Sequence, residues 1–177
     1  MPGTGRVRQR IAEQADAAII AASEAETART PGLLVGSPGE IPVSEYAAKI
    51  AALERRGRYI VAEEDGALVG HAFLEPMEML ANAHVFRLTI VVHPGHRRRG
   101  IGRAMLGDLL AWAARDPRVG KVELLVRATN EPAIRLYREF GFSEEGRFRQ
   151  RVRQPDGTFL DDIAMAWFPP TPAPELS

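Results

Sequence analysis

Apolar and polar residues recur along the chain with two distinct periods, which divide it into helical and extended segments. Apolar residues spaced three or four apart predict helices at 16–28, 44–57, 100–115 and 131–140. Shorter apolar or alternating runs predict strands, which we expect at 6–11, 59–62, 68–74, 84–92, 121–127, 146–154 and 159–168. Helices that alternate with strands in this way indicate an α/β (α+β) fold, with helices on both faces of one sheet.

Two of these segments carry more specific expectations about burial. The strand at 121–127 has a continuous apolar middle, which predicts burial on both of its faces. The last two strands flank a hairpin turn at 155–158, and regular alternation would put Phe148 and Val152 on one face with Ile163, Met165 and Trp167. The opposite face would carry Arg147, Arg149, Arg151 and Arg153. On that register we expect Arg151 to lie across from Asp162.

The length and the ends of the chain indicate one domain. The 177 residues fit one domain, which we expect to span residues 6–168. Residues 1–5 contain Gly and Pro and are expected to form a flexible N-terminus. Residues 169–177 contain four prolines and are expected to form a Pro-rich C-terminal tail.

Composition excludes several classes of function. Lys plus Arg and Asp plus Glu are both 23, so the net charge is zero and no general attraction to nucleic acid or anionic membrane is expected. The absence of cysteine excludes disulfides, thiolate zinc sites and a cysteine nucleophile. No apolar run exceeds six residues, so we expect no membrane span and no signal peptide, and a cytoplasmic location.

The sharpest motif lies at 91–104, where an apolar strand ends, a basic turn follows and a helix opens at Gly100-Ile101-Gly102. The first amides of a helix point outward unpaired, and the helix dipole adds positive charge there. Bare glycine backbone and four nearby arginines then predict a phosphate or pyrophosphate ligand. A P-loop does not fit, because Arg103 and Ala104 follow Gly102. The alternative is that both glycines only allow close helix–sheet packing.

A second motif occupies 123–142, a strand followed by one short helix. Asn130 stands at the N-cap of this helix, and Gly141 stands where a left-handed residue would end it. Tyr137 follows Asn130 by seven residues, about two turns, so both lie on one side of the helix. The alternatives are a plain helix cap for Asn130 and a packing aromatic for Tyr137.

Together the two motifs resemble the GNAT superfamily of acyl-CoA-dependent N-acetyltransferases. The matching signatures are Arg97-x-x-Gly100-x-Gly102 and Asn130-x-x-Ala133-x-x-Leu136-Tyr137-x-x-x-Gly141-Phe142. The resemblance implies a mixed, mostly antiparallel, twisted sheet of six to seven strands that splays between the two motif strands. It also implies acetyl-CoA as the co-substrate, with no metal.

The resemblance further implies which residues bind the cofactor. The backbone of Ile90, Val91 and Val92 would pair with the pantetheine arm, Asn130 would touch it, and Tyr137 would lie near the sulfur. The pyrophosphate would contact the loop residues Arg97, Arg98, Arg99, Gly100, Ile101, Gly102 and Arg103. Tyr137 would act as the general acid toward the departing thiolate, and a backbone amide near Val91 would stabilise the oxyanion.

The general base and the acceptor stay open at this point. Leu125 occupies the position of the glutamate in ribosomal-type N-terminal acetyltransferases, which leaves Glu123, His84, Glu75 or a water chain as the base. We expect the acceptor to be the primary amine of a small molecule such as an amino acid. The alternatives are a protein N-terminus or lysine as acceptor, or a non-catalytic acyl-CoA sensor, and a homodimer is left open.

Overall fold

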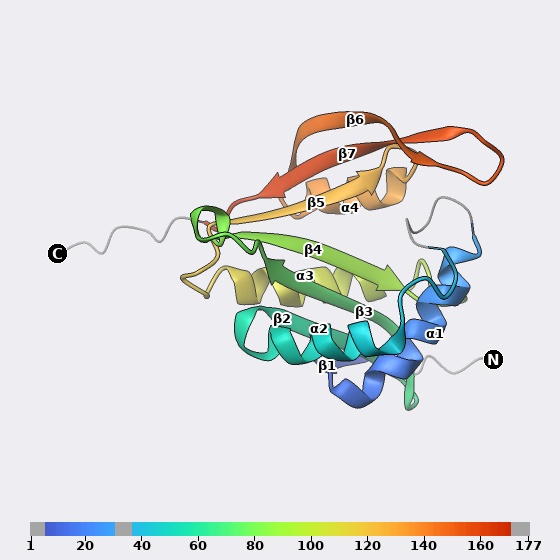
Figure 1. Ribbon diagram of the computed structural model, residues 1–177. Coiled ribbons are helices and arrows are strands. Elements are labelled where there is room, and N and C mark those ends of the chain that lie inside the picture. The colour runs from blue at the N-terminus through green and yellow to red at the C-terminus, as the bar shows by residue number, and fades with distance from the viewer. Residues whose placement is uncertain (1–5, 31–36, 171–177) are drawn as a thin grey trace.

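The computed structural model describes residues 6–30 and 37–170, which form one seven-stranded sheet covered by helices on both faces (Figure 1). The strands are β1 (Arg8–Ile11), β2 (Arg58–Glu64), β3 (Ala67–Pro76), β4 (Val85–Val92), β5 (Lys121–Arg127), β6 (Ser143–Arg153) and β7 (Phe159–Trp167). The helices are α1 (Ala17–Ala28), α2 (Val43–Arg56), α3 (Ile101–Ala113) and α4 (Glu131–Glu139), with short 3-10 turns η1 (Gln14–Asp16) and η2 (Leu80–Asn82). The predicted ends 1–5 and most of 169–177 lie outside the described residues.

The strand order is β1-β2-β3-β4-β5-β7-β6, and every neighbouring pair is antiparallel except β4 and β5. The predicted mixed, mostly antiparallel sheet is therefore confirmed. On one face, α1 and α2 bury Tyr46, Ile50 and Leu53 against β2 and β3. On the other face, α3 buries Met105 and Leu109. In the part of the chain that the structure describes, no helix combines the length and the apolar character that a membrane crossing requires.

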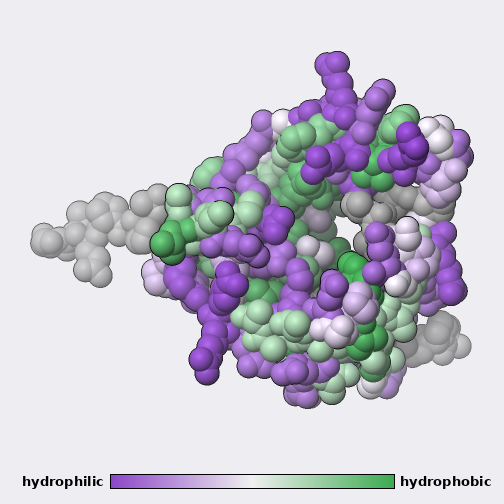
Figure 2. Space-filling model, in the orientation of Figure 1, coloured by the Kyte–Doolittle hydropathy of each residue, from purple (hydrophilic) through white to green (hydrophobic). Residues whose placement is uncertain are grey.

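The sheet opens between its two parallel strands. β4 and β5 pair only from Val85–Lys121 to Arg87–Glu123, and then the two strands diverge (Figure 1). β4 stays paired with β3 on its other side as far as Val92. The predicted splay between the two motif strands is therefore confirmed, and Figure 2 shows the molecule hollowed between the β5–β7–β6 half and the rest of the sheet.

Burial of β5 differs from the expectation. Leu124 and Val126 are buried on the helical side, but Leu125 is 48% exposed. Among residues 6–30 and 37–170, no helix covers the opposite face of β5, and β4 has already diverged beside it. The prediction that both faces of β5 are buried is therefore wrong, since an apolar run does not reveal where the neighbouring strand leaves.

The β6–β7 hairpin also departs from regular alternation. The five residues of β6 from Phe148 to Val152 lie opposite only three of β7, from Asp162 to Leu160, and Gln150 takes φ +50° in this bulge. Phe148 consequently pairs with Asp162 and is 46% exposed, so the prediction that it packs with Ile163 and Met165 is wrong. The expected single face of four arginines is interrupted as well. Arg149 and Arg151 lie in the bulge, and the Arg151 guanidinium lies over the Phe148 ring, 5.3 Å from its centroid, although the two were expected on opposite faces.

Asp162 lies elsewhere than expected. It is the β7 partner of Arg127 on β5, and the two buried side chains form an ion pair. The predicted pairing of Arg151 with Asp162 is therefore wrong. On the hairpin, Arg147 instead donates from Nε to Asp161 Oδ2 at 2.8 Å. The buried Arg127–Asp162 pair joins β5 to β7 three residues before Asn130, the N-cap of α4.

Candidate active site

The glycine loop runs from the end of β4 to the start of α3 and contains three residues whose backbone is in the left-handed conformation. Gly95 and Gly100 have φ of +83° and +77°, and Arg98 has φ +59°. The first helical hydrogen bond runs from the Ala104 amide to the Gly100 carbonyl at 3.0 Å, so the amides of 101–103 have no acceptor within the helix. A Cβ on Gly102 would approach only Val92 Cγ2, at 3.5 Å. The backbone of the first turn is therefore accessible to an anion.

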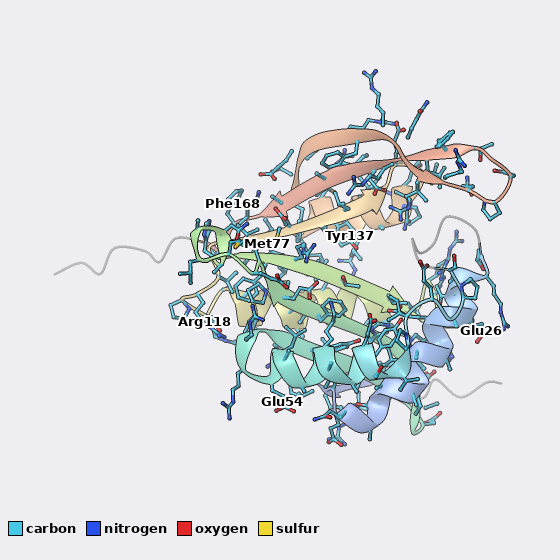
Figure 3. The ribbon with its side chains drawn as sticks, viewed as in Figure 1. Glu26, Glu54, Met77, Arg118, Tyr137 and Phe168 are labelled. Atoms are coloured by element: carbon cyan, nitrogen blue, oxygen red, sulfur yellow. The ribbon has the colours of Figure 1, made fainter. Side chains whose placement is uncertain are left out.

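The second motif forms a capped helix as predicted. Asn130 Oδ1 accepts a hydrogen bond from the Ala133 amide at 3.3 Å, and Gly141 ends the helix with φ +92°. Tyr137 lies two turns after the cap, and its ring packs at a tilt on Phe142 with the centroids 5.6 Å apart. These local interactions fix the side of α4 that faces β4, where Figure 3 shows Tyr137.

The two motifs line one cavity of about 600 Å³, which we call the loop cavity. The predicted residues that line it are Ile90, Val91, Val92, Arg97, Arg98, Gly100, Ile101, Gly102, Arg103, Asn130 and Tyr137. The lining residues that the sequence reasoning missed are Thr27, His96, Pro132, Ala133, Arg135, Leu136 and Glu139. Most of these lie on α4 between Asn130 and Tyr137, where helical spacing could have indicated them.

Charge in the loop cavity is unevenly distributed. Arg99 does not line the cavity, because its guanidinium binds both carboxylate oxygens of Glu64 on β2, with Nη1 at 2.7 Å from Oε2. This pairing lowers the pKa of Glu64. Arg103 forms an ion pair with Glu139 between α3 and α4. Among the described residues, no carboxylate pairs with Arg97, Arg98 or Arg135, which leaves positive charge at the loop end of the cavity.

The Tyr137 hydroxyl is held in its protonated form. Burial raises the pKa of Tyr137 to about 12, because a phenolate would lose its hydration there. At neutral pH the side chain is therefore a proton donor and not a base. A group of this kind suits the protonation of a leaving thiolate.

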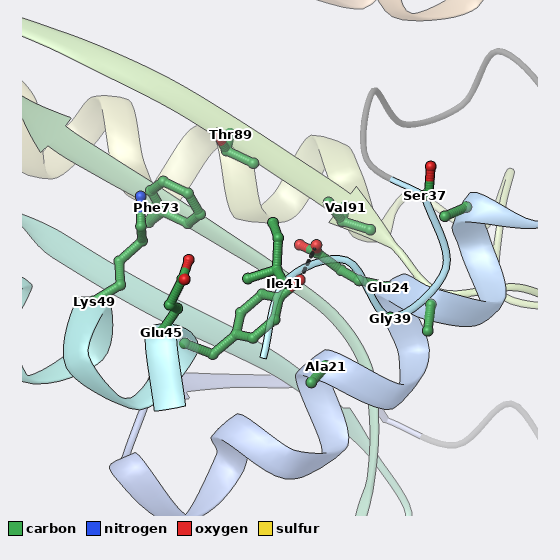
Figure 4. A pocket seen from close by; sticks show the side chains of 13 residues that line it. Ala21, Glu24, Ser37, Gly39, Ile41, Glu45, Lys49, Phe73, Thr89 and Val91 are labelled. Atoms are coloured by element: carbon green, nitrogen blue, oxygen red, sulfur yellow. Dashed lines mark hydrogen bonds between the residues drawn. The ribbon is translucent and has the colours of Figure 1, made fainter. Parts of the chain in front are cut away.

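Two further cavities lie on the opposite side of β4 from the loop cavity. The first, of about 300 Å³, lies between α1, α2 and β4, and we call it the α1–α2 cavity; Glu24, Phe73, Thr89 and Val91 are among its lining residues (Figure 4). The second, of about 570 Å³, lies between β4, β5 and the β6–β7 hairpin, and we call it the hairpin cavity. Thr89 lines both, and Val91 lines both the α1–α2 cavity and the loop cavity. All three cavities therefore meet along the splayed part of β4.

The predicted candidates for a general base lie in different places. Glu75 and Glu123 line the hairpin cavity, but Glu75 is 2.8 Å from Lys49 Nζ and Glu123 is 3.4 Å from Lys121 Nζ. His84 precedes the paired end of β4 and lines none of the three cavities. The sequence reasoning missed Glu24, which lines the α1–α2 cavity. Nothing in its local sequence distinguishes it from the other glutamates of α1.

Comparison with known proteins agrees with the two motifs. Residues 26–142 match the model of the acetyltransferase (GNAT) family. The L-amino acid N-acetyltransferase AaaT of Escherichia coli is 29% identical, over 62% of this chain and 67% of its own length. The N-alpha-acetyltransferase RimI of Mycobacterium tuberculosis is 38% identical, over 54% of this chain and 58% of its own. A mycothiol acetyltransferase of Thermomonospora curvata is 40% identical, over 44% of this chain and 28% of its own. The matched part thus spans less than two thirds of the latter two relatives.

Solved structures share the whole architecture. YncA from Salmonella typhimurium, solved with its cofactor acetyl-CoA, has a TM-score of 0.84 at 22% identity and covers 97% of this chain and 99% of its own. A phosphinothricin acetyltransferase from Sinorhizobium meliloti, in complex with acetyl-CoA, has a TM-score of 0.82 at 21% identity. The match covers 96% of this chain and 94% of that protein. The family match, the fold and the two motifs agree, and the chain belongs to the acetyltransferase (GNAT) family of acetyl-CoA-dependent N-acetyltransferases.

Proposed function

We propose that this chain transfers an acetyl group from acetyl-CoA directly to the primary amine of a small molecule, such as an amino acid or a related metabolite. The observation that carries the proposal is the splay of β4 and β5, which joins the loop cavity on one side to separate cavities on the other. Two substrates can thus approach one point from opposite sides. The name of the relative AaaT, an L-amino acid N-acetyltransferase, supports an acceptor of this class.

Acetyl-CoA fits the loop cavity by charge and by hydrogen bonding. The free amides of 101–103 and the side chains of Arg97, Arg98 and Arg135 would bind its phosphates. The edge of β4 from Leu88 to Val92 has no partner on β5, so its peptide groups are available to the amides of the pantetheine arm. Asn130, already the cap of α4, would contact the same arm.

The chemistry needs few protein groups. The amine nitrogen attacks the thioester carbonyl, the new N–C bond forms, and the oxygen becomes an oxyanion that a backbone amide near Val91 would stabilise. The C–S bond then breaks, and the thiolate takes the proton of the Tyr137 hydroxyl. General acid catalysis of this kind contributes about 100-fold or more. The amine gives up its protons to a base and to solvent.

The size of the acceptor cavity favours a small molecule over a protein. The α1–α2 cavity encloses about 300 Å³ beside β4, close to the lower bound of about 300 Å³ for sites that take drug-sized ligands. A protein N-terminus, the acceptor class in the name of the relative RimI, would instead have to run through the more exposed hairpin cavity.

The proposal is tested by calorimetry with acetyl-CoA, followed by a free-thiol release assay over free amino acids, other small amines and peptides. We expect acetyl-CoA to bind and at least one free small amine to release thiol, while the same compound with its amine already acetylated releases none. Binding without turnover on any amine would overturn the enzymatic proposal in favour of a sensor. Turnover on peptides alone would overturn the small-molecule acceptor.

A further inference from the structure

A connected set of polar side chains lies beneath the α1–α2 cavity and converges on one carboxylate, Glu24 of α1. The Tyr46 hydroxyl of α2 donates a hydrogen bond to Glu24 Oε2. The Nε2 atom of His71, on β3, lies 3.1 Å from Glu24 Oε1. On the other side of the same ring, His71 Nδ1 lies 3.0 Å from the hydroxyl of Tyr59 on β2. Side chains from α2 and β3 therefore contact the Glu24 carboxylate, and Tyr59 of β2 supports it through His71.

This set reaches from the core to the cavity surface. The His71 side chain is 0% exposed, whereas the Glu24 side chain is 15% exposed and lines the cavity. Within the described parts of the chain, His71 Nε2 makes no well-aligned hydrogen bond, although Glu24 is its near neighbour. Burying polar groups in this way costs free energy that apolar side chains would avoid. In return for that free energy, the arrangement orients the Glu24 carboxylate toward the cavity.

Glu24 is also close to the strand along which the acetyl group would lie. It shares the α1–α2 cavity with Thr89 and Val91, and Val91 continues into the loop cavity. Figure 4 shows Glu24 reaching from α1 toward Val91. The cation of the cavity, Lys49, is engaged elsewhere, since its Nζ is 2.8 Å from Glu75 and 4.8 Å from the centre of the Phe73 ring.

We propose, on the basis of the acetyl transfer proposed above, that Glu24 is a catalytic residue that binds the ammonium group of the acceptor and takes its proton, and that Tyr46 and His71 are positioning residues. The ammonium gives one proton to the Glu24 carboxylate, and the free amine then attacks the thioester. The second proton of the amine leaves to solvent once the N–C bond has formed, and the thiolate takes the proton of Tyr137. Glu24 then releases its proton to solvent and Tyr137 takes one up, which restores both groups. The net reaction converts the ammonium and acetyl-CoA into the amide, CoA as its thiol and one proton.

The walls of the cavity indicate the body of such an acceptor. Their apolar part is formed by Ala21, Ala25, Ala28, Ile41 and Phe73, and the same walls carry the polar side chains Ser37, Glu45, Tyr46, Lys49 and Thr89. A charged ammonium that lies against the apolar part is poorly hydrated, which favours loss of its proton. The substrate class is therefore a primary amine on a compact body that combines an apolar surface with at least one polar group.

The groups around Glu24 keep its carboxylate ionised, which suits it to bind an ammonium group. Burial alone would raise the pKa of Glu24, but its contacts with His71 and Tyr46 outweigh burial and lower it. His93 packs beside His71, with the ring centroids 5.6 Å apart, and is uncharged at neutral pH because burial lowers its pKa to about 4. The other titratable groups near it are Tyr59 behind His71 and, in the same cavity, Glu45 and Lys49. Glu24 is therefore ionised at neutral pH and can bind an ammonium.

The test compares Glu24→Gln with the wild type on an acceptor that the wild type acetylates. Glutamine keeps the volume and can still accept the hydrogen bond from Tyr46, but it cannot take a proton. We expect kcat/KM to fall about 100-fold at neutral pH with unchanged affinity for acetyl-CoA. We also expect activity to recover as the pH approaches the pKa of the acceptor amine, because the amine then arrives without its extra proton. Glu24→Asp should restore part of the activity.

Glu26→Gln is the matched control, because Glu26 is an exposed residue of the same helix and points away from the cavity (Figure 3). It should behave as the wild type. Full activity of Glu24→Gln at neutral pH would overturn the proposal for Glu24 while leaving the acetyl transfer intact. A loss that is equal at every pH and that Glu24→Asp does not relieve would show a structural role and also overturn it. Failure of the acetyl transfer itself would appear earlier, as a wild type that acetylates no amine.

Discussion

Arg87 and Glu123 form the last residue pair of the parallel ladder between β4 and β5. Beyond them β4 continues for five residues to Val92, still paired with β3, and no strand of the described chain pairs with its other edge. Buried peptide groups are rarely left without hydrogen-bond partners. A ligand that brings its own amides, as the pantetheine arm does, would complete this edge, and the glycine loop lies where its phosphates would follow.

The neighbouring arginines of the loop allow a matched comparison. Arg97→Gln should weaken acetyl-CoA binding about tenfold, because Arg97 lines the loop cavity without a carboxylate partner in the described chain and a hydrogen bond to a charged group is worth about 1.5 kcal/mol. Arg99→Gln should change the affinity little, since Arg99 is bound to Glu64 outside that cavity. Calorimetry with both variants measures the difference. Equal losses of acetyl-CoA affinity in the two variants would contradict the assignment of the loop end of the cavity as the phosphate site.

Tyr137→Phe should separate chemistry from binding. The variant lacks the proton donor but keeps the ring against Phe142, so we expect kcat to fall about 100-fold with little change in affinity for acetyl-CoA. Because burial raises the pKa of Tyr137 to about 12, the hydroxyl stays protonated in mildly alkaline solution, and raising the pH there should not remove the acid. Unchanged turnover at saturating substrates would leave Tyr137 with a packing role alone.

The sequence was sufficient for the parts of the site that local chemistry determines. Gly100, Asn130 and Gly141 are residue types required by a left-handed loop, a helix cap and a helix end, and the structure has them in those conformations. Because a strand leads into each motif, the fold brings both to the same parallel pair of strands. Their meeting in one cavity then follows from the topology.

The remaining features depend on tertiary contacts that no local pattern reveals. Gln150 adopts a positive φ without being Gly or Asn, and the bulge there leaves Phe148, not Arg151, opposite Asp162. The separate register of β7 on β5 pairs Asp162 with Arg127. Glu24 and His71 are 47 positions apart, and their contact depends on how α1 packs on β3. Long-range packing of this kind decides which charged side chains enter the site.

The stability of the fold should depend on pH through His93, which follows β4. Burial, followed by the charge of His71, lowers the pKa of His93 to about 4 from the usual 6.5. The unfolded chain therefore binds a proton that the folded chain resists, and stability falls as the pH drops from about 6.5 toward 4, by up to about 3 kcal/mol. His93→Asn should show a shallower loss in denaturant unfolding between pH 7 and 5. The exposed His84→Asn serves as the control and should match the wild type, whereas an identical slope for His93→Asn would refute this assignment.

The proposed acetyl transfer depends on the glycine loop binding the pyrophosphate of acetyl-CoA. Calorimetric titration of acetyl-CoA into the wild type, Gly102→Ala and Gly102→Glu measures this binding. A Cβ atom at this position would contact Val92 Cγ2 at 3.5 Å, an ordinary van der Waals distance, and a glutamate in the first turn of α3 favours the helix, so both variants should stay folded. We predict binding to the wild type, weaker binding to Gly102→Ala, and a loss of at least about 100-fold for Gly102→Glu, whose charge would occupy the phosphate site. Wild-type affinity in a folded Gly102→Glu would contradict the account.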